Sequence, residues 1–453
     1  MVRFAFIISL AILIACCHIT LSEADAQQSR NHQGTITVSF DPTQPANTFS
    51  PYRALGAGVD GHEKGEIDHI YQPSNLRAMR SAGFKPLTYR LRTELGVEAW
   101  HWNPKGTWSD PRHQRGYWTS DSNSAQPIST CYGYHLPRQG STMDQANNDG
   151  YSRLDDGDLT TFWKSNPYLD QHYTGEENAR HPQWVLIDLG SPQPVNAIKI
   201  AWAQPFATDY LVEYGVGKLA GPEAAYLRGE RAEMWRAFTK GTVHRANGSD
   251  TTIQLSDTAV AVRFVRVTMT SSSNEAAPNS RDVRDGLGYA IRELSLGMID
   301  DAGNFRDLIQ HASNHDRQTV IYVSSTDSWH RAIDKDSRTE QPGLDRVFSS
   351  GLTNGLPMLA AAPLLYDVPE NAAAQIRYLQ ARRYPVERVE MGEEPEGQHI
   401  SPEDYATLYL QWADAIHQVA PKLQLGGPCF AALDPERVGS DPVTSQEFEP
   451  TGP

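Results

Sequence analysis

Two patterns of hydrophobic residues take turns along much of this chain. Short apolar runs typical of buried strands are followed by stretches in which apolar residues recur every three or four positions, the period of an α-helix. Strands that alternate with amphipathic helices indicate a parallel sheet, so the sequence predicts an α/β domain, most simply a barrel. The predicted strands are 54–59, 87–95, 318–323, 358–366, 386–391 and 423–425, with helices at 74–82, 305–312, 343–350, 371–382 and 402–419.

The middle of the chain has a different pattern. From 183 to 267 the apolar runs are short, β-branched and alternating, and turn residues separate them. Several such strands within about 150 residues are typical of a β-sandwich. The sandwich would be inserted after the second strand of the α/β domain. Between 103 and 150 no sustained period is present, and a short alternating run at 35–40 predicts one further strand.

Four motifs of this middle region occur in the order of a known domain. They are Asp156–Trp163, Trp184–Gly190, Val262–Val267 and Tyr289–Leu294. The region resembles a discoidin domain, the coagulation factor 5/8 type C module. The resemblance implies a jelly-roll β-sandwich that binds sugars or lipid head groups through variable loops.

The same resemblance implies a structural calcium ion. Asp156, Asp158, Thr161 and Glu293 match positions whose hard oxygen atoms hold calcium in similar modules. A turn closed by Asx hydrogen bonds is the alternative role for these residues. No cofactor is expected for catalysis.

The N-terminal residues predict export. Arg3 precedes an apolar run from Phe4 to Cys17 that suits a signal peptide, and Ala24-Asp25-Ala26 predicts cleavage after Ala26. A lipid anchor at Cys16 and an uncleaved anchor are the alternatives. We therefore expect a secreted, periplasmic or cell-surface protein with no membrane span after the signal. The predicted divisions are a signal peptide at 1–26, barrel segments at 27–140 and 299–453, and the discoidin-like sandwich at 141–298.

Charge and cysteine content narrow the function further. The 453 residues include 40 Lys and Arg against 55 Asp and Glu, a net charge of −15 that would repel a phosphate backbone and excludes nucleic acid as an expected partner. Beyond the signal only Cys131 and Cys429 remain, so we expect two unpaired thiols, with one disulfide as the alternative.

Candidate catalytic groups follow the strand at 386–391. Glu393 and Glu394 would lie at the carboxyl edge of a parallel sheet, where barrel enzymes place their active sites, and repulsion with burial would raise at least one pKa. A charged loop before a helix is the alternative. The run Val389–Pro395 is similar to the Gly-Asn-Glu-Pro signature of retaining glycoside hydrolases with (β/α)8 barrels. That resemblance implies Glu394 as acid/base, with Glu393 in the place of the usual Asn.

Other side chains would join that edge. Arg92, rather than Arg90, resembles the arginine that supports the catalytic carboxylates in that clan, although a structural ion pair is the competing role. Flat aromatic faces with polar edges suit sugar rings, and core packing is the alternative for each. The candidate substrate-binding residues are Trp100, His101, Trp102, Trp329 and His330.

A nucleophile is missing from this pattern. Retention needs two carboxyl groups about 5 Å apart, and in the resembling clan the second follows the seventh strand. The residues after Glu394 hold at most two further units of roughly 30 residues each. The chain is then a fragment of a longer enzyme, or a barrel that takes its second acid from elsewhere, such as Glu94 or Asp327, or a non-catalytic relic.

Two hypotheses therefore stand. The first is an exported retaining O-glycoside hydrolase, acting on an oligo- or polysaccharide, in which the discoidin-like insert binds carbohydrate. The second is a non-catalytic glycan-binding surface protein in which the barrel only carries the insert.

Overall fold

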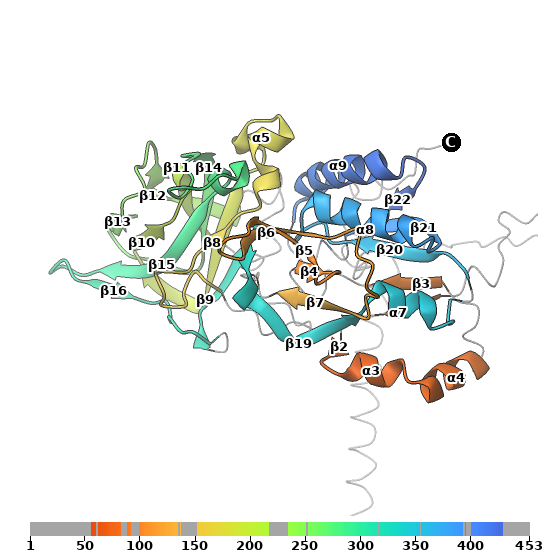
Figure 1. Cartoon of the computed structure of the whole chain (residues 1–453). Helices are drawn as coiled ribbons and strands as arrows, with labels where there is room; N and C mark the ends of the chain where they lie inside the picture. The colour runs from red at the N-terminus through yellow and green to blue at the C-terminus, as the bar shows by residue number, and fades with distance from the viewer. Residues whose placement is uncertain are drawn as a thin grey trace, which may run out of the picture. The chain divides into compact units, whose positions relative to one another are not determined.

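The structure, a computed structural model, contains a parallel sheet, a β-sandwich and two small antiparallel sheets (Figure 1). It describes residues 56–59, 62–82, 88–91, 99–134, 136, 152–216, 234–250, 252–314, 317–353, 355–392, 395 and 400–428. Side chains at 56–63, 88–100 and 337–339 are not described. Within these ranges no helix is long and apolar enough to cross a membrane.

Five parallel strands form the sheet of the α/β part. Their order in the sheet is their order in the sequence, so each pairs with the next of these five strands. They are β1 (Gly56–Val59), β3 (Thr88–Leu91), β20 (Met358–Ala362), β21 (Val386–Met391) and β22 (Gln424–Gly426). The sheet is open: in the described part of the chain β1 and β22 are its two edges, and no closed barrel forms. The expected (β/α)8 barrel is therefore not found. The parallel pairing of strands in sequential order, which such a barrel also has, is present.

The helices lie close to their expected positions. The expected helices at 74–82, 343–350, 371–382 and 402–419 correspond to α4, α7, α8 and α9. The described helices are α3 (Glu66–Ile70), α4 (Pro73–Ser81), α5 (Gln171–Thr174), α7 (Leu344–Ser349), α8 (Pro369–Ala381) and α9 (Pro402–Val419).

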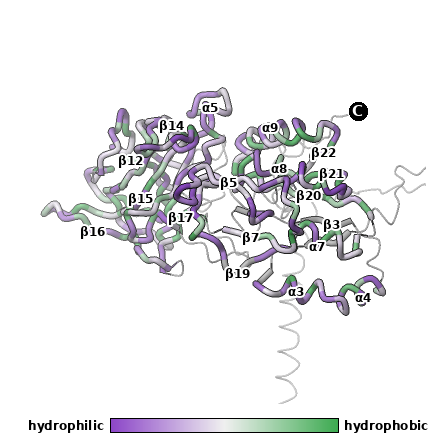
Figure 2. The backbone as a smooth tube through the Cα atoms, in the orientation of Figure 1, coloured by the Kyte–Doolittle hydropathy of each residue, from purple (hydrophilic) through white to green (hydrophobic). Residues whose placement is uncertain are grey.

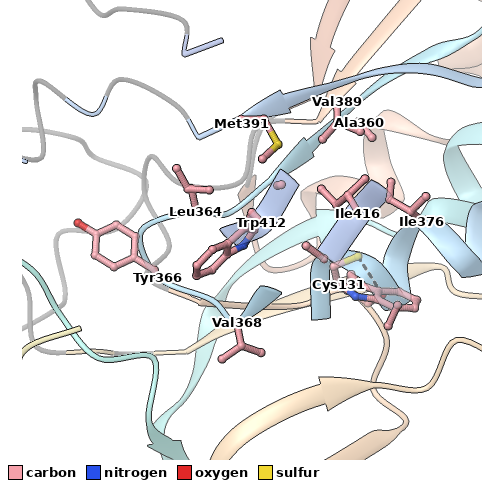
Figure 3. Close-up of a cluster of buried hydrophobic side chains, with 14 of the residues drawn as sticks. Cys131, Ala360, Leu364, Tyr366, Val368, Ile376, Val389, Met391, Trp412 and Ile416 are labelled. Carbon is pink, nitrogen blue, oxygen red and sulfur yellow. Dashed lines mark hydrogen bonds between the residues drawn. The ribbon is translucent and has the colours of Figure 1, made fainter. Parts of the chain in front are cut away.

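Apolar faces of α8 and α9 pack on β20 and β21. Trp412 and Ile416 of α9 belong to the same buried apolar cluster as Met391 and Val389 of β21 (Figure 3). Along β21 the three residues from Val389 to Met391 are all buried, as expected for a strand covered on both faces.

The middle of the chain forms two antiparallel sheets with an apolar core between them, as predicted. Figure 2 shows hydrophobic and hydrophilic positions interleaved along strands such as β14, as expected when one face is buried. The first sheet contains β8 (Trp163–Lys164), β10 (Ala197–Trp202), β13 (Thr252–Gln254), β15 (Ala290–Ile299) and β16 (Phe305–Asp307). The second contains β9 (Gln183–Val195), β11 (Ala207–Gly215), β12 (Trp235–Val243), β14 (Val260–Ser272) and β17 (Val320–Val323).

Two small sheets take three strands, β5, β6 and β7, from the region without a sequence period and the others from elsewhere in the chain. One orders β18 (His330–Arg331), β6 (Arg115–Ser120) and β5 (Gly106–Asp110). The other orders β2 (His62–Glu63), β19 (Lys335–Pro342), β7 (Thr130–Tyr134) and β4 (Ala99–His101).

Two expectations for the α/β part are wrong. The expected helix at 305–312 begins instead as strand β16, which pairs with β15. The expected parallel strand at 318–323 is β17, which pairs antiparallel with β9 and extends the sandwich. The predicted strand at 35–40 lies outside the described residues, and the predicted domain divisions stay predictions.

Candidate functional site

Strand β21 carries the candidate catalytic region. It lies between β20 and β22, with Glu390 opposite Ala361 on one side and Gly426 on the other. Gly392 continues the turn away from the strand with a φ of 79° and donates its N–H to the Ala362 carbonyl at 3.1 Å. Glu393, Glu394 and Arg92, with Glu94, lie outside the described residues. The structure therefore places the strand that leads to Glu394, and the catalytic assignments stay predictions.

Asp327, the other candidate second acid, is held inside a buried network. Its Oδ2 accepts hydrogen bonds from the Lys164 Nζ at 2.8 Å and the Tyr117 hydroxyl at 2.9 Å. Its Oδ1 accepts the Trp329 N–H at 3.2 Å. Both oxygens of Asp327 are thus occupied by groups of the chain itself.

Three of the candidate sugar-binding residues are interior. His101 and His330 meet through their Nε2 atoms at 2.8 Å, and the His101 ring is stacked on Trp118 with centroids 4.1 Å apart. Trp102 is also buried and donates its indole N–H to the Asn371 side chain at 3.1 Å. These rings present no open face to solvent, because each is at most 5% exposed.

Burial controls the charge of the histidine pair. It lowers the pKa of His330 to about 4, and burial together with the neighbouring His330 holds the pKa of His101 well below its usual value. His330 Nδ1 faces the Ser328 carbonyl at 2.6 Å and must donate to it. Nε2 of neutral His330 therefore accepts, and His101 donates.

Trp329 differs from the other candidates. It is half-buried, and its ring lies 5.8 Å from the ring of Phe162, which is also half-buried. Of Trp100 only the backbone, in β4, is described. Trp329 is therefore the one candidate aromatic residue whose described side chain keeps part of its surface open.

The four candidate calcium residues lie together. Asp156 accepts the Thr161 hydroxyl at 2.6 Å and the Asp158 N–H at 2.8 Å, as in an Asx turn. Glu293 of β15 accepts the Gly157 N–H at 3.0 Å, which ties the loop to the sheet. The structure thus brings these residues together beside β15 of the sandwich.

Asp155, which the sequence analysis missed, adds a carboxylate beside this loop. It is fully buried, and neither oxygen has a hydrogen-bond partner. Burial raises the pKa of Asp155 to about 7, although the neighbouring Ser152 hydroxyl acts in the opposite direction, and repulsion from Glu293 adds to the rise. Glu293 Oε2 is likewise buried without a partner. Uncompensated carboxylate oxygens of this kind are hard ligands that fit a calcium ion.

Besides a calcium ion, His311 could compensate the negative charge of these carboxylates. Its ring lies between Glu293, at 2.5 Å, and Asp307, at 3.1 Å, and these two hydrogen bonds raise the pKa of His311 to about 10. No three His, Cys, Asp or Glu side chains are arranged as a metal site in the described part of the chain. A calcium ion here would also need backbone carbonyl, hydroxyl or water oxygens. The run Asp155-Asp156 is a visible sequence signal for the extra carboxylate, whereas nothing near His311 marks its role.

Comparison with known proteins identifies one part of the chain. Residues 138–283 match the F5/8 type C domain family. The chain therefore contains an F5/8 type C domain, as its motifs predict, and the two antiparallel sheets described above are formed largely by this region.

Several solved structures are similar to part of the chain. Chitosan-binding module 1 of a chitosanase/glucanase from Paenibacillus sp. IK-5 is 23% identical, with 36% of this chain and 96% of that chain covered at a TM-score of 0.24. The CBM32 of AlyQ, in complex with 4,5-unsaturated mannuronic acid, is 18% identical, covering 36% and 95%, with a TM-score of 0.21. CpGH89CBM32-6 produced by Clostridium perfringens is 18% identical, covering 38% and 95%, with a TM-score of 0.19. No curated protein matches the chain.

Proposed function

We propose that this protein binds glycans through its F5/8 type C domain. The family match over residues 138–283 carries the proposal, because modules that resemble this one bind sugars or lipid head groups. An aromatic face is the expected contact for a sugar ring. Trp329 lies outside the matched residues but beside Phe162, which lies within them, and it offers the half-open ring that such a contact needs.

Binding of the full-length protein to an array of oligo- and polysaccharides tests this proposal. We expect Trp329→Ala to weaken binding to the glycan that scores highest by about tenfold or more, because an aromatic contact and its buried area are lost. Phe264→Ala removes another half-buried ring of the sandwich, on β14, and should leave the affinity unchanged. Absence of binding to every glycan would contradict the proposal.

The finer proposal is a retaining glycoside hydrolase with Glu394 as acid/base, Glu393 beside it and Arg92 as carboxylate support. Its support is the sequential parallel order β1-β3-β20-β21-β22, together with the sequence, in which residue 394 follows shortly after the end of β21 at Met391. Residues 1–26 would direct export, with the lipid anchor at Cys16 as the alternative, and bring the enzyme to extracellular or periplasmic glycans.

Turnover of aryl glycosides by the full-length protein tests the catalytic assignment. Glu394→Gln should reduce kcat by several orders of magnitude on substrates with poor leaving groups, because these need a proton donor. Substrates with good leaving groups should be affected less in their first step. Undiminished turnover by Glu394→Gln would contradict the assignment, and glycan binding without turnover would favour the non-catalytic alternative.

A structural calcium ion belongs to the same proposal. Asp156, Asp158, Thr161 and Glu293 would supply oxygen ligands, and the ion would compensate the buried oxygens of Asp155 and Glu293. We expect millimolar calcium to raise the Tm above its value in EDTA, with the same concentration of magnesium as control. An unchanged Tm would instead assign the compensation to His311.

A further inference from the structure

One segment of the sandwich lies against the helices that follow β20 and β21. The segment 165–181, between β8 and β9, is defined here as the β8–β9 segment. Its Tyr168 is almost fully buried and packs edge-on against Trp412 of α9, with ring centroids 5.2 Å apart. The side-chain amide of Gln411, also on α9, donates to the Tyr168 carbonyl at 2.8 Å.

The same segment reaches the first turns of both helices. The Tyr168 hydroxyl donates to Glu370, in the first turn of α8, at 3.3 Å. Asn166 donates its side-chain amide to the carbonyl of Leu365, in the loop between β20 and α8, at 3.5 Å. Helices that follow parallel strands begin at the carboxyl edge of the sheet, so these contacts lie on the side where an α/β protein builds its site.

His181 makes a further buried contact with the start of α9. Its Nδ1 donates to Asp404 Oδ1 at 2.7 Å, and both side chains are about 5% exposed. Asp404 is the third residue of α9, and its N–H already donates to the N-cap Ser401 hydroxyl at 3.1 Å. A buried hydrogen bond to a carboxylate contributes more to stability than an exposed one, so its loss should loosen this contact.

We propose that the β8–β9 segment forms one side of the site at the carboxyl edge of the parallel sheet. We also propose that His181 is a positioning residue that fixes the first turn of α9. The sandwich is then an integral part of the α/β site rather than a tethered module. The identity of any molecule held at that edge rests on the proposed function, whereas the positioning of α9 by His181 does not.

Hydrogen exchange of the full-length protein tests the proposal without a glycan. We expect His181→Ala to speed exchange in the first turns of α9, at 402–408, by about tenfold or more, because a buried charged hydrogen bond is lost. His181→Asn keeps a donor near the position of Nδ1 and should restore much of the protection. His244→Ala removes a matched but exposed histidine–aspartate pair, 2.9 Å from Asp209 within the sandwich, and should leave α9 unchanged.

A second variant keeps the test decisive if His181→Ala does not fold. Gln411→Ala removes the half-buried bond to Tyr168 and should speed exchange of the same turns to a smaller degree. Unchanged exchange at 402–408 in the folded His181 and Gln411 variants, or an equal effect of His244→Ala, would overturn the proposal. Failure of the proposed function would appear instead as absent glycan binding or turnover, with the exchange result unaltered.

Discussion

At the scale of single residues, burial decides what His101 and His330 can do. Sequence analysis placed both at an open sugar-binding mouth because loop histidines next to tryptophan suit that role. The structure instead encloses them among Trp108, Trp118 and Tyr134. Two neutral rings sharing one hydrogen bond link β4 of one small sheet to β18 of the other. The pair therefore acts as a cross-link that protonation would break.

This cross-link predicts a loss of stability in acid. The pKa of His330 is about 4 in the folded protein and about 6.5 in the unfolded chain, so the unfolded chain binds more protons between these values. The contribution is complete above pH 6.5 and is lost as the pH falls toward 4, by up to about 1.4 kcal/mol per pH unit.

Urea unfolding of wild type and His330→Gln between pH 4.5 and 7.5 measures this loss. The variant should be less stable than wild type at pH 7, and this difference in the free energy of unfolding should shrink as the pH falls toward 4.5. The comparison is needed because burial raises the pKa of Asp155 to about 7 and of Asp367 to about 8, which acts in the opposite direction. Parallel pH profiles for the two proteins would contradict the prediction.

At the scale of elements, sequence pattern identified segments well but not always their partners. Helix α9 was predicted with its bounds because Ser401 and Pro402 mark its start and apolar residues recur along one face. Strand β17 was assigned to the wrong sheet. Its Ile321 and Val323 enter the sandwich core while Tyr322 packs on the other face, so it reads as a fully buried run. A parallel strand gives the same run, and periodicity cannot separate the two.

The helix predicted at 305–312 failed for a related reason. Phe305, Leu308, Ile309 and Ala312 have helical spacing, yet β16 pairs with β15 and the Leu308 N–H donates to the Leu296 carbonyl at 2.8 Å. Pairing with a distant strand overrode the local pattern. Strands β5, β6 and β7 were missed because they are short and lie in a polar stretch without a sustained period.

The N-cap of α9 gives a prediction at this scale. The Ser401 hydroxyl accepts the Asp404 N–H, so Ser401→Ala should lower the free energy of unfolding by about 1 kcal/mol. Ser401→Asp keeps an acceptor and should retain most of the stability. Chemical denaturation of the three proteins measures this order, and a Ser401→Ala variant as stable as wild type would refute it.

At the scale of the whole molecule, the described sandwich and α/β elements share buried contacts. Tyr168 and Leu169 belong to the same apolar core as Leu365, Trp412 and Ile416. Five of the six expected parallel strands and the presence of an inserted sandwich could be predicted, because each depends on local patterns and family motifs. The contacts between the parts could not, since they depend on pairs such as His181 and Asp404 that are distant in sequence.

Arg284 shows how many groups one such contact can involve. Its guanidinium lies 3.8 Å from the Tyr117 ring centroid, donates to the Tyr168 hydroxyl at 3.0 Å and pairs with Asp282 at 2.7 Å. It therefore connects the turn Val283–Gly286 of the sandwich to β6 of a small sheet. Shared groups of this kind couple the folding of the elements that they join.

The buried pair of Lys164 and Asp327 makes this coupling measurable. Both side chains are at most 5% exposed, and Asp327 also accepts the Tyr117 hydroxyl from β6. Lys164→Ala leaves a buried carboxylate without its cation and should lower the free energy of unfolding by about 3–5 kcal/mol. Lys240→Ala breaks a comparable pair with Asp257 that is exposed, so it should remain close to wild type.

Calorimetry of the full chain decides whether the stability lost in Lys164→Ala is lost by the sandwich and the rest of the chain together. If Lys164 couples the sandwich to the rest, its removal should lower the temperature of one common transition. Two separated transitions, only one of them shifted by Lys164→Ala, would mean that the parts unfold independently. Because Trp163 and Trp184 lie in the sandwich and Trp412 in α9, tryptophan fluorescence and far-UV circular dichroism should then give different midpoints, whereas coupled unfolding requires that they coincide.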